Sequence, residues 1–225
     1  MKDYLLISNT KENKISDFCL NFVSSHIEKT TNKTISYREL SYRKAYEWEL
    51  PSNKYDSKLE KIMSDFQSNY EIDCNFIKIT EKRKKKLLIA DMDSTIIKEE
   101  SLDELARQIG KEKEVSFITN EAMNGRIEFK KALEERVAIL KGNSTDILEN
   151  LKKNININHG ARELIQTMNM NGSITVLVSG GFTFLTEYLK ELLGFKHSHA
   201  NTLQIIQNEF KKFVITGKVE EPVLD

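Results

Sequence analysis

The sequence has few residues that interrupt regular structure, and it lacks a long apolar run. It contains 2 prolines and 9 glycines among 225 residues, so we expect most of the chain to form helices and strands. No apolar stretch approaches the roughly 18 residues that span a bilayer, and the first residues lack the apolar core of a secretory signal. These absences predict a cytoplasmic protein without a membrane partner.

Cysteine is equally scarce, and neither sign of charge is in excess. Cys19 and Cys74 lie far apart and form no C-x-x-C pair, so we expect small buried side chains rather than a disulfide or a metal site. Lys and Arg total 34, and Asp and Glu also total 34. A nucleic-acid partner is not expected, because no net positive field would attract one.

The first 80 residues have the pattern of a small α+β domain. The spacings of apolar residues predict a strand over 3–8, a helix after Ser16, a strand over 42–50, a helix over 59–70 and a strand over 72–79. A further strand near residue 37 is left open.

A basic run, KRKKK at Lys82 to Lys86, follows this domain. It fits either a nucleic-acid or localisation patch or a solvated linker. The balanced net charge favours the linker, and we place it over residues 81–86.

The remainder, residues 87–225, has the pattern of an α/β domain. The apolar run 87–90 is typical of a strand covered on both faces of a parallel sheet, and a second such strand is predicted over 173–181, after a helix over 161–168. Between them we expect a helical insertion at about 98–155. Ser101 and Glu104 suggest a capping box for its first helix, which Gly110 ends, and further helices are expected near 113–124 and 127–141.

Two aspartates, Asp91 and Asp93, directly follow the first apolar strand. Functional groups collect beyond the carboxyl ends of strands in open α/β sheets. Two carboxylates this close repel each other unless a divalent cation such as Mg²⁺ joins them, or one stays protonated, or both. A carboxylate in this position can act as a nucleophile toward phosphorus.

The second strand ends in the sequence VSGGF, with Ser179, Gly180 and Gly181 leading into a helix. A hydroxyl and open backbone N–H groups near a helix N-terminus can hold a phosphate. A tight turn that requires glycine explains the glycines equally well, so both interpretations stay open.

Arg136 lies on the apolar stripe of a predicted helix, beside Phe129 and Leu133. A guanidinium on such a face needs an anion. Periodicity alone favours a structural arginine at the edge of the stripe over a ligand-binding one.

The segments DMDSTIIKEESLDELA and VSGGF, with helices between them, resemble the haloacid-dehalogenase-type phosphotransferases, and among them the phosphoserine phosphatase family. The resemblance covers about residues 85–225. It implies a parallel Rossmann-like sheet with a helical cap, a Mg²⁺ cofactor and the hydrolysis of O-phospho-L-serine. By position and pattern, residues 1–80 look like the small ACT-like domain that precedes some family members, which leaves a homodimer open.

The resemblance also implies roles in the core of the site. Asp91 would attack the phosphoryl group, and Asp93 would donate a proton to the leaving oxygen and later accept one from water. Ser179 and the Gly180 amide would hold the phosphoryl oxygens. The Asp91 carboxylate and the Asp93 backbone carbonyl would bind Mg²⁺.

The cap would recognise the rest of the substrate. By the same resemblance, Glu100 would bind the ammonium group and Arg136 the carboxylate. Met123 and Phe129 would shield the site from water, although a helical core would also contain such residues.

The sequence departs from the family pattern at its end. The family continues with a lysine and a G-D-G-x-x-N-D segment that supplies a third metal ligand, whereas this chain has no Gly-Asp dipeptide. We therefore expect an incomplete sheet, with the strand before Asp91 at its edge, and weak or no hydrolysis by the 225-residue polypeptide. The alternatives are a phosphatase or phosphotransferase for another small metabolite, and an inactive protein that binds an amino acid or dimerises.

Overall fold

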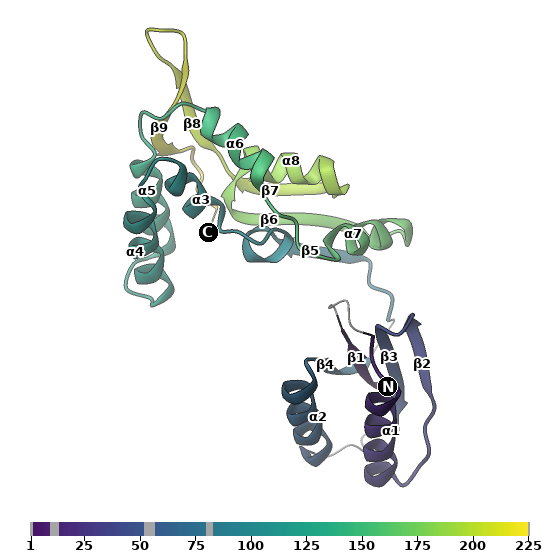
Figure 1. Ribbon diagram of the computed structural model, residues 1–225. Coiled ribbons are helices and arrows are strands. Elements are labelled where there is room, and N and C mark those ends of the chain that lie inside the picture. The colour runs from purple at the N-terminus through teal and green to yellow at the C-terminus, as the bar shows by residue number, and fades with distance from the viewer. Residues whose placement is uncertain (1, 10–13, 52–56, 80–82, 225) are drawn as a thin grey trace. The chain divides into compact units, whose positions relative to one another are not determined.

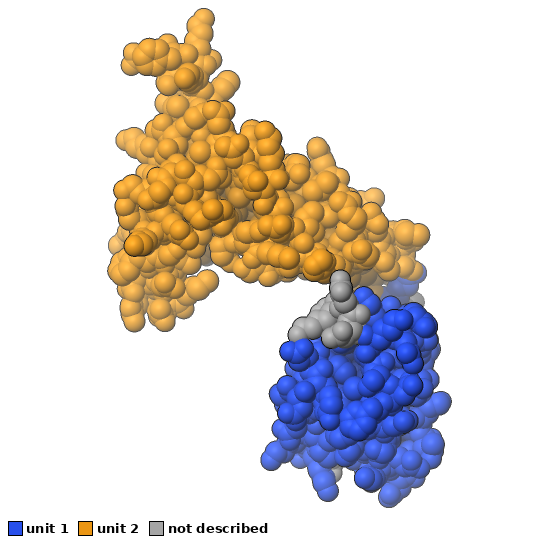
Figure 2. Space-filling view, in the orientation of Figure 1, with its two compact units in different colours: residues 1–84 blue, residues 85–225 orange. Residues whose placement is uncertain are grey.

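The computed structural model describes residues 2–9, 14–51, 57–79 and 83–224. The chain divides into two compact units, residues 1–84 and residues 85–225, which Figure 2 shows in different colours. Each unit has its own hydrophobic core.

The first unit is a four-stranded antiparallel sheet with two helices (Figure 1). Its elements are β1 (Lys2–Ser8), α1 (Asp17–Thr31), β2 (Tyr37–Ser41), β3 (Ala45–Leu50), α2 (Ser57–Tyr70) and β4 (Asp73–Ile79). The strand order is β2-β3-β1-β4, and the element order is that of the ferredoxin-like β-α-β-β-α-β motif. The strand left open near residue 37 is therefore present, as β2.

Local signals set most of these boundaries. Ser16 begins α1 as expected, because its hydroxyl accepts the Cys19 N–H at 3.3 Å. Cys19 is buried and Cys74 half-buried, and both are free thiols. Tyr42, however, was wrongly assigned to a strand. It lies in the β2–β3 turn, 71% exposed, where Arg43 takes a φ of 52° and reverses the chain.

One described residue of the basic run, Arg83, makes side-chain contacts within the first unit. Arg83 forms an ion pair with Glu47, a buried residue of β3, and lies over the Tyr4 ring at 4.9 Å from its centroid. Lys82 lies outside the described residues. Arg83 therefore differs from a freely solvated linker charge.

The second unit contains a parallel sheet, β5-β6-β7, and an antiparallel hairpin, β8-β9 (Figure 1). Its strands are β5 (Leu87–Asp91), β6 (Ile174–Phe182), β7 (His197–Asn201), β8 (Leu203–Gln207) and β9 (Phe213–Val219). Its helices are α3 (Ser101–Gln108), α4 (Glu112–Met123), α5 (Phe129–Ile139), α6 (Asp146–Asn154), α7 (Ala161–Met170) and α8 (Thr183–Leu193). The predicted parallel α/β sheet with inserted helices is confirmed. Of the helices that the structure describes, none has both the length and the apolar composition to cross a bilayer.

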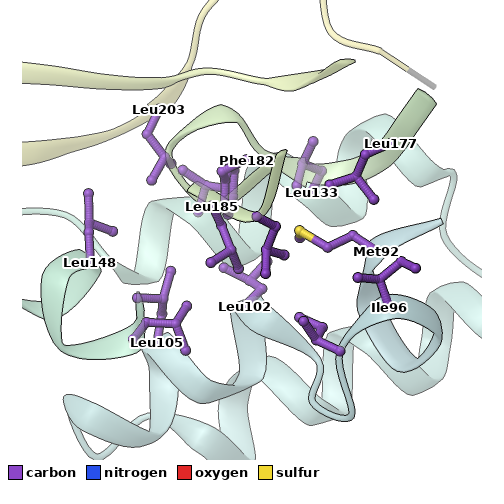
Figure 3. Packing of buried hydrophobic residues seen from close by; sticks show 14 of the residues in the cluster. Met92, Ile96, Leu102, Leu105, Leu133, Leu148, Leu177, Phe182, Leu185 and Leu203 are labelled. Atoms are coloured by element: carbon purple, nitrogen blue, oxygen red, sulfur yellow. The ribbon is translucent and has the colours of Figure 1, made fainter. Parts of the chain in front are cut away.

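The core of this unit covers one face of the sheet. Leu177 of β6 and Leu185 of α8 lie in it, both fully buried, together with Met92 (Figure 3). On the opposite face, Ile89 is 61% and Ile174 is 52% exposed. The expectation that β5 is covered on both faces is therefore wrong for the described part of the chain.

The reason is the handedness of the two crossovers. The strands run β5, β6, β7 in one direction across the sheet, so two right-handed crossovers place α7 and α8 on the same face. As expected, β5 is an edge strand among the described strands.

A pair of substitutions in β6 tests this one-sided core. We expect Leu177→Ala to lower the free energy of unfolding by about 3 kcal/mol, because it opens a cavity. Ile174→Ala, three residues earlier on the other face, should cost about 1 kcal/mol or less. Urea unfolding followed by circular dichroism measures both changes.

Tryptophan fluorescence provides the internal control. The single tryptophan, Trp48, lies in the first unit, so its transition should not move in either variant. Equal losses of stability in the two variants would contradict a one-sided core.

Candidate active site

The site begins where β5 ends. Met92 is fully buried in the core (Figure 3). Asp91 and Asp93 flank it in the chain, at the carboxyl end of β5. After Asp93 the backbone makes one wide turn, with Ser94 at a φ of 52° and the Ile97 N–H bonded to the Met92 carbonyl at 3.0 Å.

A cavity of about 380 Å³ lies over this turn. The end of β5, the helices α3, α4 and α5, and the glycines of β6 form its walls. The structure thus brings together every predicted site residue except Ser179: Asp91, Asp93, Glu100, Met123, Phe129, Arg136 and Gly180. Met123 and Phe129 are 74% and 36% exposed.

Asp93 is held by two donors. Its Oδ1 accepts the Ser101 backbone N–H at 2.9 Å, and its Oδ2 lies 3.4 Å from the Ser179 hydroxyl, which donates to it. Burial raises the pKa of Asp93 to about 6, the negative charges of Glu100 and Asp91 add to the rise, and the contacts with Ser101 oppose it. Asp93 can therefore hold a proton near neutral pH, where an exposed aspartate would not.

The contact with Ser101 corrects the predicted capping box. Helix α3 begins at Ser101, and its N-cap is Glu100, whose side chain makes no capping bond. The Asp93 carboxylate takes the capping role instead, from outside the helix. The Ser101 hydroxyl is buried without a partner in hydrogen-bonding geometry.

The last residues of β6, Ser179 to Gly181, make a local turn contact and a close approach, and the phosphate-binding interpretation stays a prediction. The Ser179 side chain is buried, and its Oγ accepts the Gly181 N–H at 2.9 Å, as in a tight turn. A Cβ on Gly180 would lie 2.7 Å from Cζ of Phe129, so a larger residue here would push the ring aside. The Gly180 carbonyl accepts the Asn201 side-chain amide at 2.9 Å, which fixes the turn beside the cavity.

Glu100 and Arg136 lie on the cavity wall with different partners. The Ser94 hydroxyl donates to Glu100 Oε1 at 2.7 Å. Arg136 donates from Nε to the Ala132 carbonyl at 3.1 Å and from Nη1 to the Thr119 hydroxyl at 3.3 Å.

Arg136 is half-buried at the wall of the cavity. Burial lowers the pKa of its guanidinium, and the acids Asp103, Glu100 and Asp93 oppose that effect. The ion pairs among the described residues do not include it. A half-buried cation that lines a cavity and has no ion-pair partner is arranged to receive an anion.

Sequence reasoning missed three polar residues around the site: Ser94, Asp103 and Thr119. Helical spacing could have indicated two of them. Thr119 lies four residues before Met123 on α4, and Asp103 lies three residues after Glu100 at the start of α3, so each shares a face with a predicted site residue.

The oxygen donors suit a hard divalent cation only in part. The Asp91 carboxylate is exposed and close enough to Asp93 to raise its pKa, and a cation between them would offset this repulsion. The described residues contain no group of three His, Cys, Asp or Glu side chains that could hold a metal. Asp91 and the Asp93 carbonyl would bind an ion whose other positions water fills.

Comparison with known proteins relates the chain to phosphatases and other hydrolases. The phosphoserine phosphatase of Archaeoglobus fulgidus is 40% identical over 146 residues, which cover 65% of this chain and 41% of that one. A solved phospho-aspartyl intermediate analogue of phosphoserine phosphatase is 40% identical, with a TM-score of 0.54 over 61% of this chain and 64% of that chain.

A hydrolase from Salmonella enterica serovar Typhi shares the fold over 99% of this chain and 73% of its own, with a TM-score of 0.78 at 21% identity. The chain spans about two fifths of the Archaeoglobus relative. The family model of haloacid dehalogenase-like hydrolases matches residues 88–224. The chain therefore belongs to the haloacid dehalogenase-like hydrolase family.

Proposed function

We propose that the protein hydrolyses O-phospho-L-serine to L-serine and phosphate through an aspartyl-phosphate on Asp91. The observation that carries the proposal is the composition of one cavity wall. A carboxylate that can act as a nucleophile, a half-buried acid, a glutamate and an arginine outside the described ion pairs line the same space of about 380 Å³. Relatives named phosphoserine phosphatase at 39 to 40% identity support the choice of substrate.

Phosphoryl transfer then uses the two aspartates in turn. A carboxylate oxygen of Asp91 attacks phosphorus, the bond between phosphorus and the seryl oxygen breaks, and protonated Asp93 gives its proton to that oxygen. Water next attacks the phosphorus of the aspartyl-phosphate and passes a proton to Asp93. The bond between phosphorus and Asp91 breaks, which releases phosphate and restores both side chains.

The remaining residues bind and orient the substrate. Arg136 would hold its carboxylate and Glu100 its ammonium group. The Gly180 N–H and the Ser179 hydroxyl would contact the phosphoryl group, and Met123 and Phe129 would exclude water at the mouth. Bound Mg²⁺ would offset negative charge on the transferring group, held by Asp91 and the Asp93 carbonyl.

We further propose that residues 1–80 are an ACT-like domain, which the β-α-β-β-α-β order of its elements supports. A homodimer and a cytoplasmic location belong to the same proposal, and the free thiols of Cys19 and Cys74 support the latter.

Asp91→Asn tests the nucleophile. We expect slow Mg²⁺-dependent phosphate release from O-phospho-L-serine by the parent and only the background rate in the variant, because an amide cannot form the aspartyl-phosphate. A colorimetric phosphate assay measures both. Asp65→Asn, an exposed change in α2, should release phosphate as the parent does. Release that continues at the parent's rate in Asp91→Asn would overturn the proposal.

Arg136→Ala tests the substrate class. We expect kcat/KM for O-phospho-L-serine to fall about 10- to 100-fold, because hydrogen bonds to a charged group are lost. Turnover of O-phosphoethanolamine, which lacks the carboxylate, should stay within about twofold. Arg126→Ala removes an exposed arginine of the same cap, paired with Glu121, and should change neither substrate. An equal loss for both substrates would show that Arg136 does not bind the carboxylate.

The raised pKa of Asp93 predicts a pH-dependent gain of stability in Asp93→Asn. The folded pKa of about 6 lies above the ordinary 3.8, so ionisation of Asp93 costs stability as pH rises through this interval. The variant avoids this cost. At pH 7.5 in metal-free buffer, the free energy of unfolding of the variant should exceed that of the parent by about 1 to 3 kcal/mol. Urea unfolding measures this difference.

The difference should disappear at about pH 3, below the ordinary pKa of 3.8, where Asp93 is largely protonated in both states of the parent. A gain that is the same at both pH values would assign the effect to a cause other than the charge.

A further inference from the structure

A chain of polar contacts leads from Arg136 to the neighbouring helices. Nη1 of Arg136 donates to the Thr119 hydroxyl at 3.3 Å. That hydroxyl lies 3.1 Å from the Val115 carbonyl and 3.5 Å from Asp103 Oδ1. The contacts link α5, α4 and α3, the helices that lie together beside the sheet in Figure 1.

The Thr119 hydroxyl has one proton and two lone pairs. Its proton goes to Val115 or Asp103, both acceptors, so the lone pairs face the donor Nη1. Together with the Ala132 carbonyl on Nε, this fixes the guanidinium plane at two points. The second terminal nitrogen makes no hydrogen bond within the described residues, and the group lines the cavity.

Asp103 adds a negative charge close to these contacts. Its Oδ2 accepts from the Ser116 hydroxyl at 3.5 Å. Burial raises the pKa of Asp103, and Arg136 acts against the rise, so the two charges interact without an ion pair. The carboxylate therefore attracts the guanidinium, while its own hydrogen bonds go to Ser116 and Thr119 of α4.

We propose that Thr119, supported by Asp103, is a positioning residue that aims the Arg136 guanidinium into the cavity, ready for the carboxylate of the substrate. The assignment of that carboxylate to Arg136 rests on the proposed function. Without the Thr119 contact, the long arginine side chain would lose rotamer order and part of its affinity for a planar anion.

The test compares two ligands in metal-free buffer by calorimetry, so that turnover does not interfere. O-phospho-L-serine and O-phosphoethanolamine share the phosphate and the ammonium group, and only the first has a carboxylate. For Thr119→Val we expect the Kd of phosphoserine to rise about fivefold, the size of one lost hydrogen bond. The Kd of phosphoethanolamine should not change.

Two variants separate positioning from packing. Thr119→Ser keeps the hydroxyl and should keep the Kd of the parent for phosphoserine. Asn120→Ala changes an exposed residue of the same helix, and should produce no carboxylate-specific loss. Equal weakening of both ligands in Thr119→Val, or no weakening, would overturn the proposal.

Crystal structures of Thr119→Val and Thr119→Ser give a readout that needs no ligand. We expect the guanidinium to leave its place in the first variant and to keep it in the second. If the parent binds neither compound, the proposed function fails, and these structures still decide the positioning role. A guanidinium that stays in place in Thr119→Val would refute it.

Discussion

The geometry of the site depends on the hydrogen bond from the Ser101 backbone N–H to Asp93 Oδ1. A buried carboxylate needs donors, and the start of a helix offers N–H groups without partners in the helix. The contact joins the end of β5 to the start of α3, and so it connects the sheet with the inserted helices. Because Met92 is buried between the two aspartates, Asp93 cannot turn away without disturbing the core.

Burial, which the Ser101 contact opposes, distinguishes the two carboxylates. Asp93 is withdrawn from water and its pKa rises to about 6, whereas Asp91 stays exposed with a hydroxyl, that of Thr95, at 3.5 Å. The two side chains differ in their exposure to water, although they lie only two positions apart in the chain. One is suited to hold a proton and the other to attack.

The sequence predicted what local pattern determines. The parallel strands, the position of Asp91 and Asp93 at a strand end, and the helical insertion all follow from apolar spacing and strand polarity. The start of α3 was predicted with the wrong cap, because the residue that caps it comes from eight positions earlier in the chain. The sequence pattern also did not predict the uncovered face of β5 and β6. Which face the helices cover depends on the order of the strands in the sheet, and apolar spacing within one strand does not reveal that order.

The partners of Arg136 likewise depend on packing between helices. Periodicity placed Arg136 on an apolar stripe and favoured a structural role, but spacing along one helix cannot reveal what two neighbouring helices supply. Thr119 and Asp103 become partners of Arg136 only when α3, α4 and α5 pack together. Arg136 donates hydrogen bonds to the neutral oxygens of Ala132 and Thr119, and it interacts with Asp103 without an ion pair. Its charge therefore remains able to bind an anion, whereas a tight ion pair would have neutralised it. The cap therefore holds its arginine in place without neutralising it.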